Sequence, residues 1–358
     1  MQAMRLSFAP LCAALLAAGN AAFAQQFSGQ NITLIVNYSA GGPSDIEARI
    51  IAKHVPKYVQ GLSSLVVRNV AGAGGRIAVN QLGESSQRDR LNISFFTWNP
   101  LDQIVQDSAL RVRYNDLKLV TGLQQVSLLY IRRDAPPGIG KPADIAKLQP
   151  FKAGGLGPTG HGVLRQRLAL DLLGAKYETI SGYKGLRDID IAMLQGDIHL
   201  SNNSLPGYIT SAKPNLIDKG IAMPLLQYDY NRPGAVNGRS PALPDVPSFL
   251  EVYKEVWGKD ATPSGEKWQV LQLISSIVDS MYRTVFMPPI APAAALAEMR
   301  RAFDRLGGDP EFIADYEKVV RTKPHFIPGA EGERIIAALG SVPPSLVAFL
   351  REYMAKPQ

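Results

Sequence analysis

A strand-like run, a glycine-rich loop and a helical pattern follow one another repeatedly in this chain, and this alternation limits its possible folds most strongly. Residues 31–59 begin with β-branched side chains, pass through Gly41 and Gly42, and continue with apolar residues at helical spacing. Residues 64–84 repeat the same order, and a third strand-like run covers 92–100. The order predicts an α/β fold in which a parallel sheet is covered by helices.

The same arrangement returns in the middle of the chain. After a boundary rich in proline and glycine at 136–145, residues 151–174 again read as strand, glycine loop and helix. A strand and turn at 177–185 and a helix at 186–197 follow. A chain of 358 residues exceeds one typical domain, so we expect two α/β lobes, although one large α/β domain would also accommodate the repeat.

The expected connections between these lobes lie at two places. A long β-like region at 117–134 and a proline-rich crossover loop at 230–249 flank the second unit, and hinges are expected near 124–126 and 229–232. The remainder is mostly helical, with one further strand at 283–289. The predicted organisation is a signal peptide at 1–24, a first lobe at 25–125, a second lobe at 126–230, and completion of the first lobe with C-terminal helices at 231–358.

The first 24 residues have the composition of a secretory signal. Arg5 is their only charge, a short apolar run follows it, and an A-x-A cleavage site ends at Ala24. A membrane anchor is the alternative, but the apolar run is too short to span a bilayer as a helix. A lipoprotein is disfavoured because Cys12 lacks small residues before it. We therefore expect export by a cleavable signal.

Cysteine content and charge narrow the class of protein. Cys12 is the only cysteine, so the exported chain would have no disulfide, thiolate metal site or cysteine nucleophile. Export without disulfides is typical of a periplasmic protein stabilised by a large core. The net charge of +7 is spread over scattered Lys and Arg, which argues against nucleic acid and weakly favours anionic solutes.

The glycine loops predict a site for an anion. A loop between a strand and a helix exposes unpaired N–H groups at the helix N-terminus, where the helix dipole is positive. Gly41 and Gly42 would let the backbone approach a ligand closely, and Pro43 suits the first helical turn. Asp45 either turns back to cap the helix, as Ser44 could, or accepts from a ligand amine, hydroxyl or water. A tight turn without a ligand is the alternative reading.

The free energies involved show that one glycine loop is not enough to bind a solute tightly. A helix end contributes roughly 0.3–2 kcal/mol to a charge interaction, whereas micromolar binding needs about 8 kcal/mol. Two opposed loops that close over a buried solute would supply more. Residues 154–162 provide the second loop, with Thr159 and His161 as its polar side chains and Gly160 between them.

Other polar residues are weaker candidates, and catalytic patterns are absent. Asn99 follows a strand end at the expected rim of the cleft, and Asn202 follows the strand-like run at 198–201; each could donate to a solute or close a turn. The sequence has no G-x-S-x-G or H-E-x-x-H motif, and four dispersed His do not form a metal pattern. The loop at 71–75 does not complete a dinucleotide fingerprint. No enzyme activity, cofactor or metal is expected.

Six runs of the sequence resemble those of a known family. The family is that of the solute-binding proteins of tripartite tricarboxylate transporters, the TctC or Bug family. The chain is similar to it first in "ITLIVNYSAGGPSDIEARIIAKHV" and "VVRNVAGAGGRIAVNQL". Further similar runs follow in the same order: "GPTGHGVLRQRLALDLLG", "YKGLRDIDIAMLQGDI", "ALPDVPSFLE" and "FMPPIAPAAALAEMRRAF". The resemblance implies a type II periplasmic-binding-protein fold, with two doubly wound α/β lobes, a hinge and a central cleft. It also implies a carboxylate-bearing solute handed to a membrane permease.

The resemblance assigns ligand contacts to three segments, and the chain departs from the family at others. Ala40 to Asp45, Gly157 to Gly162 and Tyr183 to Gly185 match the family's binding loops. Arg76 stands where the family has a small or amide residue and could add a bidentate carboxylate contact, or could be a solvated helix residue. His199 replaces a common Asp, "QRDRLNISFF" replaces the common "DGYTL" run, and residues 253–281 are longer than usual.

These observations predict a periplasmic, monomeric protein that binds a small organic carboxylate for a transporter of the tripartite tricarboxylate type. The alternatives are an exported partner of a membrane sensor and, less favoured, a hydrolase. The predicted ligand-binding residues are Ala40, Gly41, Gly42, Ser44, Asp45, Gly74, Arg76, Asn99, Thr159, Gly160, His161, Tyr183 and Asn202.

Overall fold

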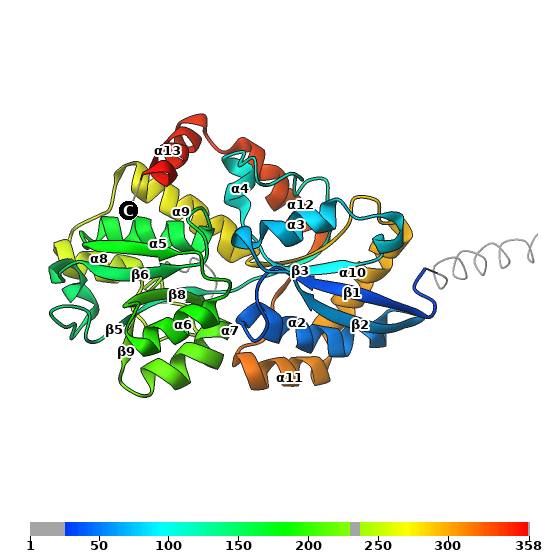
Figure 1. Ribbon diagram of the computed structural model, residues 1–358, viewed down its shortest axis with the longest axis horizontal. Coiled ribbons are helices and arrows are strands. Elements are labelled where there is room, and N and C mark those ends of the chain that lie inside the picture. Colours follow the sequence, from blue (N-terminus) through cyan, green and yellow to red (C-terminus); the bar gives the residue numbers. More distant parts are fainter. Residues whose placement is uncertain (1–25, 230–236, 357–358) are drawn as a thin grey trace, which may run out of the picture.

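The computed structural model describes residues 26–229 and 237–356, which form two lobes side by side (Figure 1). Each lobe is built around one sheet, and helices cover both faces of each sheet. The predicted signal peptide at 1–24 and part of the predicted crossover loop lie outside the described residues. The two-lobed α/β architecture expected from the sequence is confirmed.

The first sheet has six strands in the order β11-β4-β10-β3-β1-β2. The three strands of the first repeat pair in parallel, as predicted, whereas β10 runs antiparallel to β3 and β4. The sheet is therefore mixed, because later parts of the chain return to it. Its strands are β1 (Gln30–Val36), β2 (Leu62–Asn69), β3 (Ile93–Thr97), β4 (Lys118–Leu123), β10 (Arg283–Met287) and β11 (Phe326–Pro328).

Alternation along β1 shows why helices are needed on both faces of this sheet. Leu34 and Val36 belong to a core cluster shared with α2, α10 and α11, whereas Ile35 points into another cluster shared with α3, α4 and α12. A strand buried on both sides reads as a continuous apolar run, which is what the sequence shows. The helices are α2 (Pro43–His54), α3 (Arg76–Gly83), α4 (Pro100–Ile104), α10 (Ala293–Gly307), α11 (Pro310–Val320) and α12 (Gly329–Ala338).

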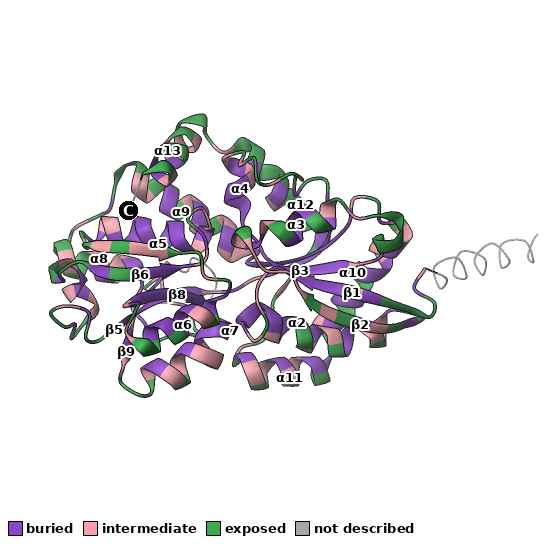
Figure 2. Ribbon diagram, viewed as in Figure 1, coloured by how far each residue is buried: buried purple, intermediate pink, exposed green. Residues whose placement is uncertain are grey.

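The second sheet has five strands in the order β7-β6-β8-β5-β9, again with parallel and antiparallel pairs. Its strands are β5 (Ser127–Arg132), β6 (Phe151–Gly155), β7 (Tyr177–Ser181), β8 (Leu200–Ser204) and β9 (Ala222–Gln227). The helices around it are α5 (His161–Leu172), α6 (Leu186–Gln195), α7 (Leu205–Gly207), the π-helix η5 (Tyr208–Ile217), α8 (Phe249–Trp257) and α9 (Gly265–Ser280). Figure 2 shows that the inner strands of both sheets are mostly buried, whereas exposed and half-buried residues lie on the edge strands β2 and β7 and on the outer faces of the helices.

Single 3₁₀ turns complete the connections of both lobes. They are η1 (Val55–Tyr58), η2 (Ala73–Gly75), η3 (Gln87–Asp89), η4 (Pro142–Lys147) and η6 (Leu339–Ser341).

The chain passes between the sheets at places that partly match the predicted hinges. The strand β4 ends at Leu123 in the first sheet and β5 begins at Ser127 in the second, so residues 124–126 connect the lobes as expected. The return differs from the prediction. The helices α8 and α9 pack against η4 and α5 of the second lobe, and the chain re-enters the first sheet only between α9 and β10. The second crossing is therefore at 281–282 rather than 229–232.

The C-terminal helix α13 (Pro344–Ala355) touches both lobes. Arg351 Nε donates to the carbonyl oxygen of Val105 in the first lobe at 3.0 Å. On the other side, Tyr353 Oη donates to Asp171 Oδ2 of α5 at 2.8 Å. The helix thus ties the lobes together outside the cleft; residues 231–358 were predicted to complete the first lobe, with C-terminal helices.

Within the described ranges, no single helix has the length and apolar character to cross a membrane. By length and composition only, the segments Gly329–Ser341 and Pro344–Ala355 would qualify as a pair, and they are bent by 82° at their junction.

Candidate functional site

A cavity lies between the lobes, where loops that follow strands of both sheets face each other. Its volume is about 30 Å³, room for about two water molecules. The first lobe and the crossing segment contribute Tyr38, Ser39, Gly42, Pro43, Ser44, Thr97 and Tyr282 to its lining; the second lobe contributes Leu156, Gly157, Gly160, His161, Gly162, Val163, Gly185, Leu186 and Asn202.

The N-termini of three helices meet at this cavity. The N-cap residues are Gly42 for α2, Gly160 for α5 and Gly185 for α6, and all three line it. Each has extended backbone angles, and none has a side chain that could accept from the helix amides. Positive dipole ends therefore point at one small space, together with those first-turn N–H groups that no side chain caps. The sequence predicted the first two helix ends as opposed partners; the third came only from the resemblance, through its tyrosine–glycine turn.

Asp45 shapes the first loop and does not line the cavity. Its Oδ2 accepts from the Gly41 amide and from Arg49 Nε, both at 2.9 Å, and the side chain is only 4% exposed. Burial alone would raise the pKa of Asp45, but these hydrogen bonds hold it below its usual value. Of the two predicted roles, the structure therefore shows the turned-back one. Gly41 adopts φ +76°, a conformation that favours glycine.

A buried cation supports the hydroxyl groups on the first-lobe side. Ser44 Oγ lies 2.9 Å from Thr97 Oγ1, and Thr97 Oγ1 accepts in turn from Arg283. Arg283 Nε is paired with Glu47 at 2.8 Å, with both side chains almost fully buried. Ser44 and Thr97 are thus held in place by a charge that does not itself reach the cavity lining.

His161 is a neutral wall residue. Burial, followed by the nearby charges of Arg165 and Arg283, lowers the pKa of His161 to about 3. The imidazole packs edge-to-face on Tyr282 with ring centres 5.2 Å apart, and the backbone N–H donates to Asn99 Oδ1 at 3.0 Å. Asn99 therefore caps α5 from the opposite lobe.

The depressed pKa of His161 predicts how the stability of the fold depends on pH. The unfolded chain takes up a proton on this residue below pH 6.5, and the folded chain does so only near pH 3. The protonation of His161 therefore leaves the free energy of unfolding unaffected above pH 6.5. This free energy falls as the pH drops below that value, by up to about 1.4 kcal/mol per pH unit. We expect His161→Phe to flatten the fall in urea-unfolding stability between pH 6.5 and 4. The exposed His325, changed to Phe, is the control, and parallel curves for His161→Phe and the native protein would contradict the expectation.

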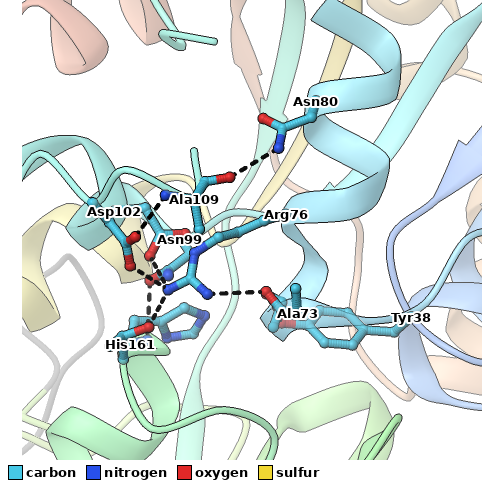
Figure 3. A network of polar contacts seen from close by, with 11 residues as sticks. Tyr38, Ala73, Arg76, Asn80, Asn99, Asp102, Ala109 and His161 are labelled. Carbon is cyan, nitrogen blue, oxygen red and sulfur yellow. Dashed lines mark hydrogen bonds and ion pairs between the residues drawn. The ribbon is translucent and has the colours of Figure 1, made fainter. Parts of the chain in front are cut away.

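Arg76 joins the lobes beside the cavity (Figure 3). Its Nη2 lies 2.9 Å from Asp102 Oδ1 and 2.7 Å from Asp107 Oδ2, and it also donates to Thr159 Oγ1 of the second lobe. Burial raises the pKa of Asp102 to about 6, with Arg76 partly offsetting the effect. The guanidinium predicted to bind a ligand carboxylate is thus held by two carboxylates of the protein and does not line the cavity.

The other predicted residues divide into groups by position. Those that line the cavity are Gly42, Ser44, Gly160, His161 and Asn202; those at the contact between the lobes beside it are Gly74, Arg76, Asn99 and Thr159; and Ala40, Gly41 and Asp45 lie in the first loop just outside it. Asn202 is anchored through Nδ2 to Gln166 Oε1 at 3.0 Å. Tyr183 does not line the cavity and packs against the core cluster of the second lobe.

Several lining residues were not predicted. Tyr38 directly precedes the first glycine loop, and its hydroxyl donates to the Gly74 carbonyl at 3.0 Å. Thr97 and Tyr282 end or precede strands whose neighbours in the sheet come from distant parts of the chain. The signal for Leu186 was available, since a glycine before a helical run marks a helix start much as Gly42 does.

One group outside the cleft has a geometry that could suggest a metal. Among the described residues, ligand atoms of His54, Asp309 and Glu311 lie within 4.8 Å of one another. However, Lys57 Nζ is 3.0 Å from Asp309 and 3.6 Å from Glu311. This ammonium group already pairs with both carboxylates where a metal would lie, so we assign no metal there.

Comparisons with solved structures find the same fold in periplasmic binding proteins. The periplasmic binding protein BugD has a TM-score of 0.65 and 17% sequence identity, with 92% of this chain and 99% of that chain covered. The chain has the periplasmic-binding-protein fold. MatC from Rhodopseudomonas palustris, with bound malate, has a TM-score of 0.63 and 16% identity over 90% of this chain and 98% of its own. Rpa4515 from R. palustris, with adipate, has a TM-score of 0.64 and 18% identity, with 90% of this chain and 97% of that chain covered.

These likenesses confirm the type II two-lobed fold that the resemblance implied. No family model matches the chain, and no curated protein matches it in sequence. The three solved structures compared above share the fold at 16–18% identity.

Proposed function

We propose that this protein is an exported solute-binding protein of the TctC or Bug type, which captures a small organic carboxylate between its lobes. The observation that carries the proposal is the meeting of three glycine-capped helix N-termini, from both lobes, at one cavity between the lobes. Such ends favour an anion and act most strongly where water is excluded. The malate and adipate in two matching structures are carboxylates, in agreement with this chemistry.

Capture is coupled to a movement of the lobes. The cavity is too small to admit a solute from outside without parting them, and the connections at 124–126 and 281–282 are the places where a hinge would bend. We propose that the closed, loaded form presents the cargo to a membrane permease. The predicted signal peptide would deliver the chain to the periplasm, where such a permease takes up its substrate.

The test of this function is a binding screen. The purified chain without its signal peptide is heated with a panel of organic acids, sugars and divalent metals, each at the same ionic strength. A ligand at 100 times its Kd adds about 2.7 kcal/mol to the free energy of unfolding, which raises the melting temperature measurably. We expect a shift with a carboxylate. A shift only with a sugar or a metal would refute carboxylate capture, and conversion of the acid, followed by NMR, would reveal an enzyme instead.

A further inference from the structure

The cavity is short because the lobes touch each other on two sides of it. On the side of α3 and α5, a Cβ added to Gly157 would lie 3.4 Å from Gly74 Cα, so the two glycine loops are in contact. The contact of Arg76 with Thr159, and that of Asn99 with the His161 amide, lie on the same side. These contacts hold the two glycine loops against each other on this side of the cavity.

The opposite side, where α2 and α6 lie, is closed in a similar way (Figure 1). The Ser39 amide donates to the Lys184 carbonyl across the lobes at 3.4 Å. The Arg187 guanidinium covers Gly41 so closely that an added Cβ would lie 2.5 Å from Nη1. A ligand in the closed form is therefore confined on both sides.

The residues that line the cavity can accommodate one anionic group but not two. Apart from the helix N-termini and a few hydroxyl and amide groups, the wall consists of apolar side chains, among them Leu156, Val163 and Leu186, and of the rings of Tyr38 and Tyr282. No Lys or Arg is among the described residues that line the cavity. Inside the cavity, a second carboxylate would lose its water without finding a cation among the lining residues, because the guanidinium of Arg187 lies over Gly41 outside the lining.

Charges beside the cavity add to this discrimination. Arg76 is paired with both Asp102 and Asp107, so one positive charge faces two carboxylates. When both are ionised, the group as a whole is negative and repels a second carboxylate that extends toward it.

We propose that the cargo is a small monocarboxylate with a short apolar body, and that the Arg76–Asp102–Asp107 group excludes acids with a second carboxylate. This inference rests on the proposed function of carboxylate capture and names its substrate class. A cavity of about 30 Å³ is smaller than such an acid, so the lobes close less fully around the acid than they do in this structure. The carboxylate then lies at the helix N-termini, and the apolar body packs against Val163, Leu186 and the tyrosine rings. Arg76 acts here as a specificity residue that does not itself touch the ligand.

The first test compares affinities by calorimetry at pH 7.5 and constant ionic strength. The probes are acetate, propionate, butyrate and lactate on one side, and succinate, malate and adipate on the other. We expect the tightest monocarboxylate to bind at least tenfold more tightly than any dicarboxylate. A dicarboxylate that binds as tightly as the best monocarboxylate overturns this inference but leaves carboxylate capture intact. Absence of binding by every acid overturns both.

The second test changes the wall of the cavity. Leu186 is 8% exposed and lines the cavity, whereas Leu194, on the same helix, is 40% exposed. Leu186→Ala should raise the affinity for butyrate relative to acetate at least fivefold, because the apolar body gains room. Leu194→Ala should leave this ratio unchanged. An equal response of the two variants overturns the placement of the apolar body.

The third test changes the charge beside the cavity. Asp107→Asn removes one carboxylate from Arg76, and the exposed Asp116, changed to Asn, alters the net charge equally at a different place. We expect Asp107→Asn to improve the affinity for succinate relative to propionate at least threefold, and Asp116→Asn to have no such effect. The same ratio in both variants overturns the role given to the Arg76 group.

Discussion

We expect Gly42→Val to weaken carboxylate binding at least a hundredfold in Kd, while the protein stays folded. Gly42 has φ −83° and ψ 173°, angles that valine adopts readily, and an added Cβ meets only the Ser39 carbonyl oxygen at 3.5 Å. The isopropyl group would occupy a cavity of about 30 Å³ and cover the N-terminus of α2. A hundredfold loss corresponds to about 2.8 kcal/mol. Calorimetry with the best acid of the panel measures it, and thermal unfolding without ligand checks the fold.

A second variant and a control make this result specific. Gly160→Val places the same side chain at the N-terminus of α5, where the backbone is again extended, and should cause a similar loss. Gly340 has open space around it in the first lobe, far from the cavity lining, so Gly340→Val should bind normally. Native affinity in both Gly42→Val and Gly160→Val would mean that the helix ends do not hold the ligand.

The strands and helices of the first lobe were predictable because their signals are local. Ile32, Leu34 and Val36 alternate with Ile35 in a strand that is buried on both faces, and such strands read as apolar runs whatever surrounds them. The glycines before α2 and α5 also act locally, since they start a helix without a side chain over its amides. The two opposed helix ends of the site followed from these features alone.

The partners of charged side chains were not predictable, because they depend on contacts between distant segments. Arg76 meets Asp102 and Asp107, which are 26 and 31 residues away in the sequence, and it crosses to Thr159 of the other lobe. The sequence allowed either a ligand contact or a solvated residue, and the structure shows neither. Only the packing of α3 against the loops of both lobes selects these partners.

The second crossing was misplaced for the same reason. Residues 249–280 have helical patterns that fit either lobe. Their place against the second lobe depends on contacts with α5, such as the hydrogen bond from Trp257 Nε1 to the Leu172 carbonyl at 3.0 Å and the ion pair of Lys267 with Asp171 at 2.6 Å. No local pattern encodes these pairs. By contrast, two glutamines interrupt the β-like region that contains residues 124–126, and the crossing between the lobes at this place was predicted from the sequence.

Arg283→Met should produce the largest loss of stability of any change considered for this protein, about 3–5 kcal/mol in the free energy of unfolding. Glu47 and Arg283 are 0% and 1% exposed, so removal of the arginine leaves a carboxylate buried without its cation. Glu47 would retain hydrogen bonds from Tyr316 and Gln125, which do not replace a positive charge. Urea unfolding measures the loss. Arg111→Met breaks the exposed pair with Glu84 and should cost no more than about 1 kcal/mol.

The double variant Glu47→Leu/Arg283→Met shows whether the cost comes from the unpaired charge. Replacing both partners of a buried pair by apolar residues of similar size is often nearly neutral, so the double variant should be more stable than Arg283→Met alone. Additive losses would instead mean that the pair is not coupled. Because Arg283 also donates to Thr97, which holds Ser44 at the cavity, the double variant should still bind carboxylate more weakly than the native protein. Restored stability together with weakened binding would separate the two roles of this arginine: to neutralise Glu47 and to hold the hydroxyl groups of the site.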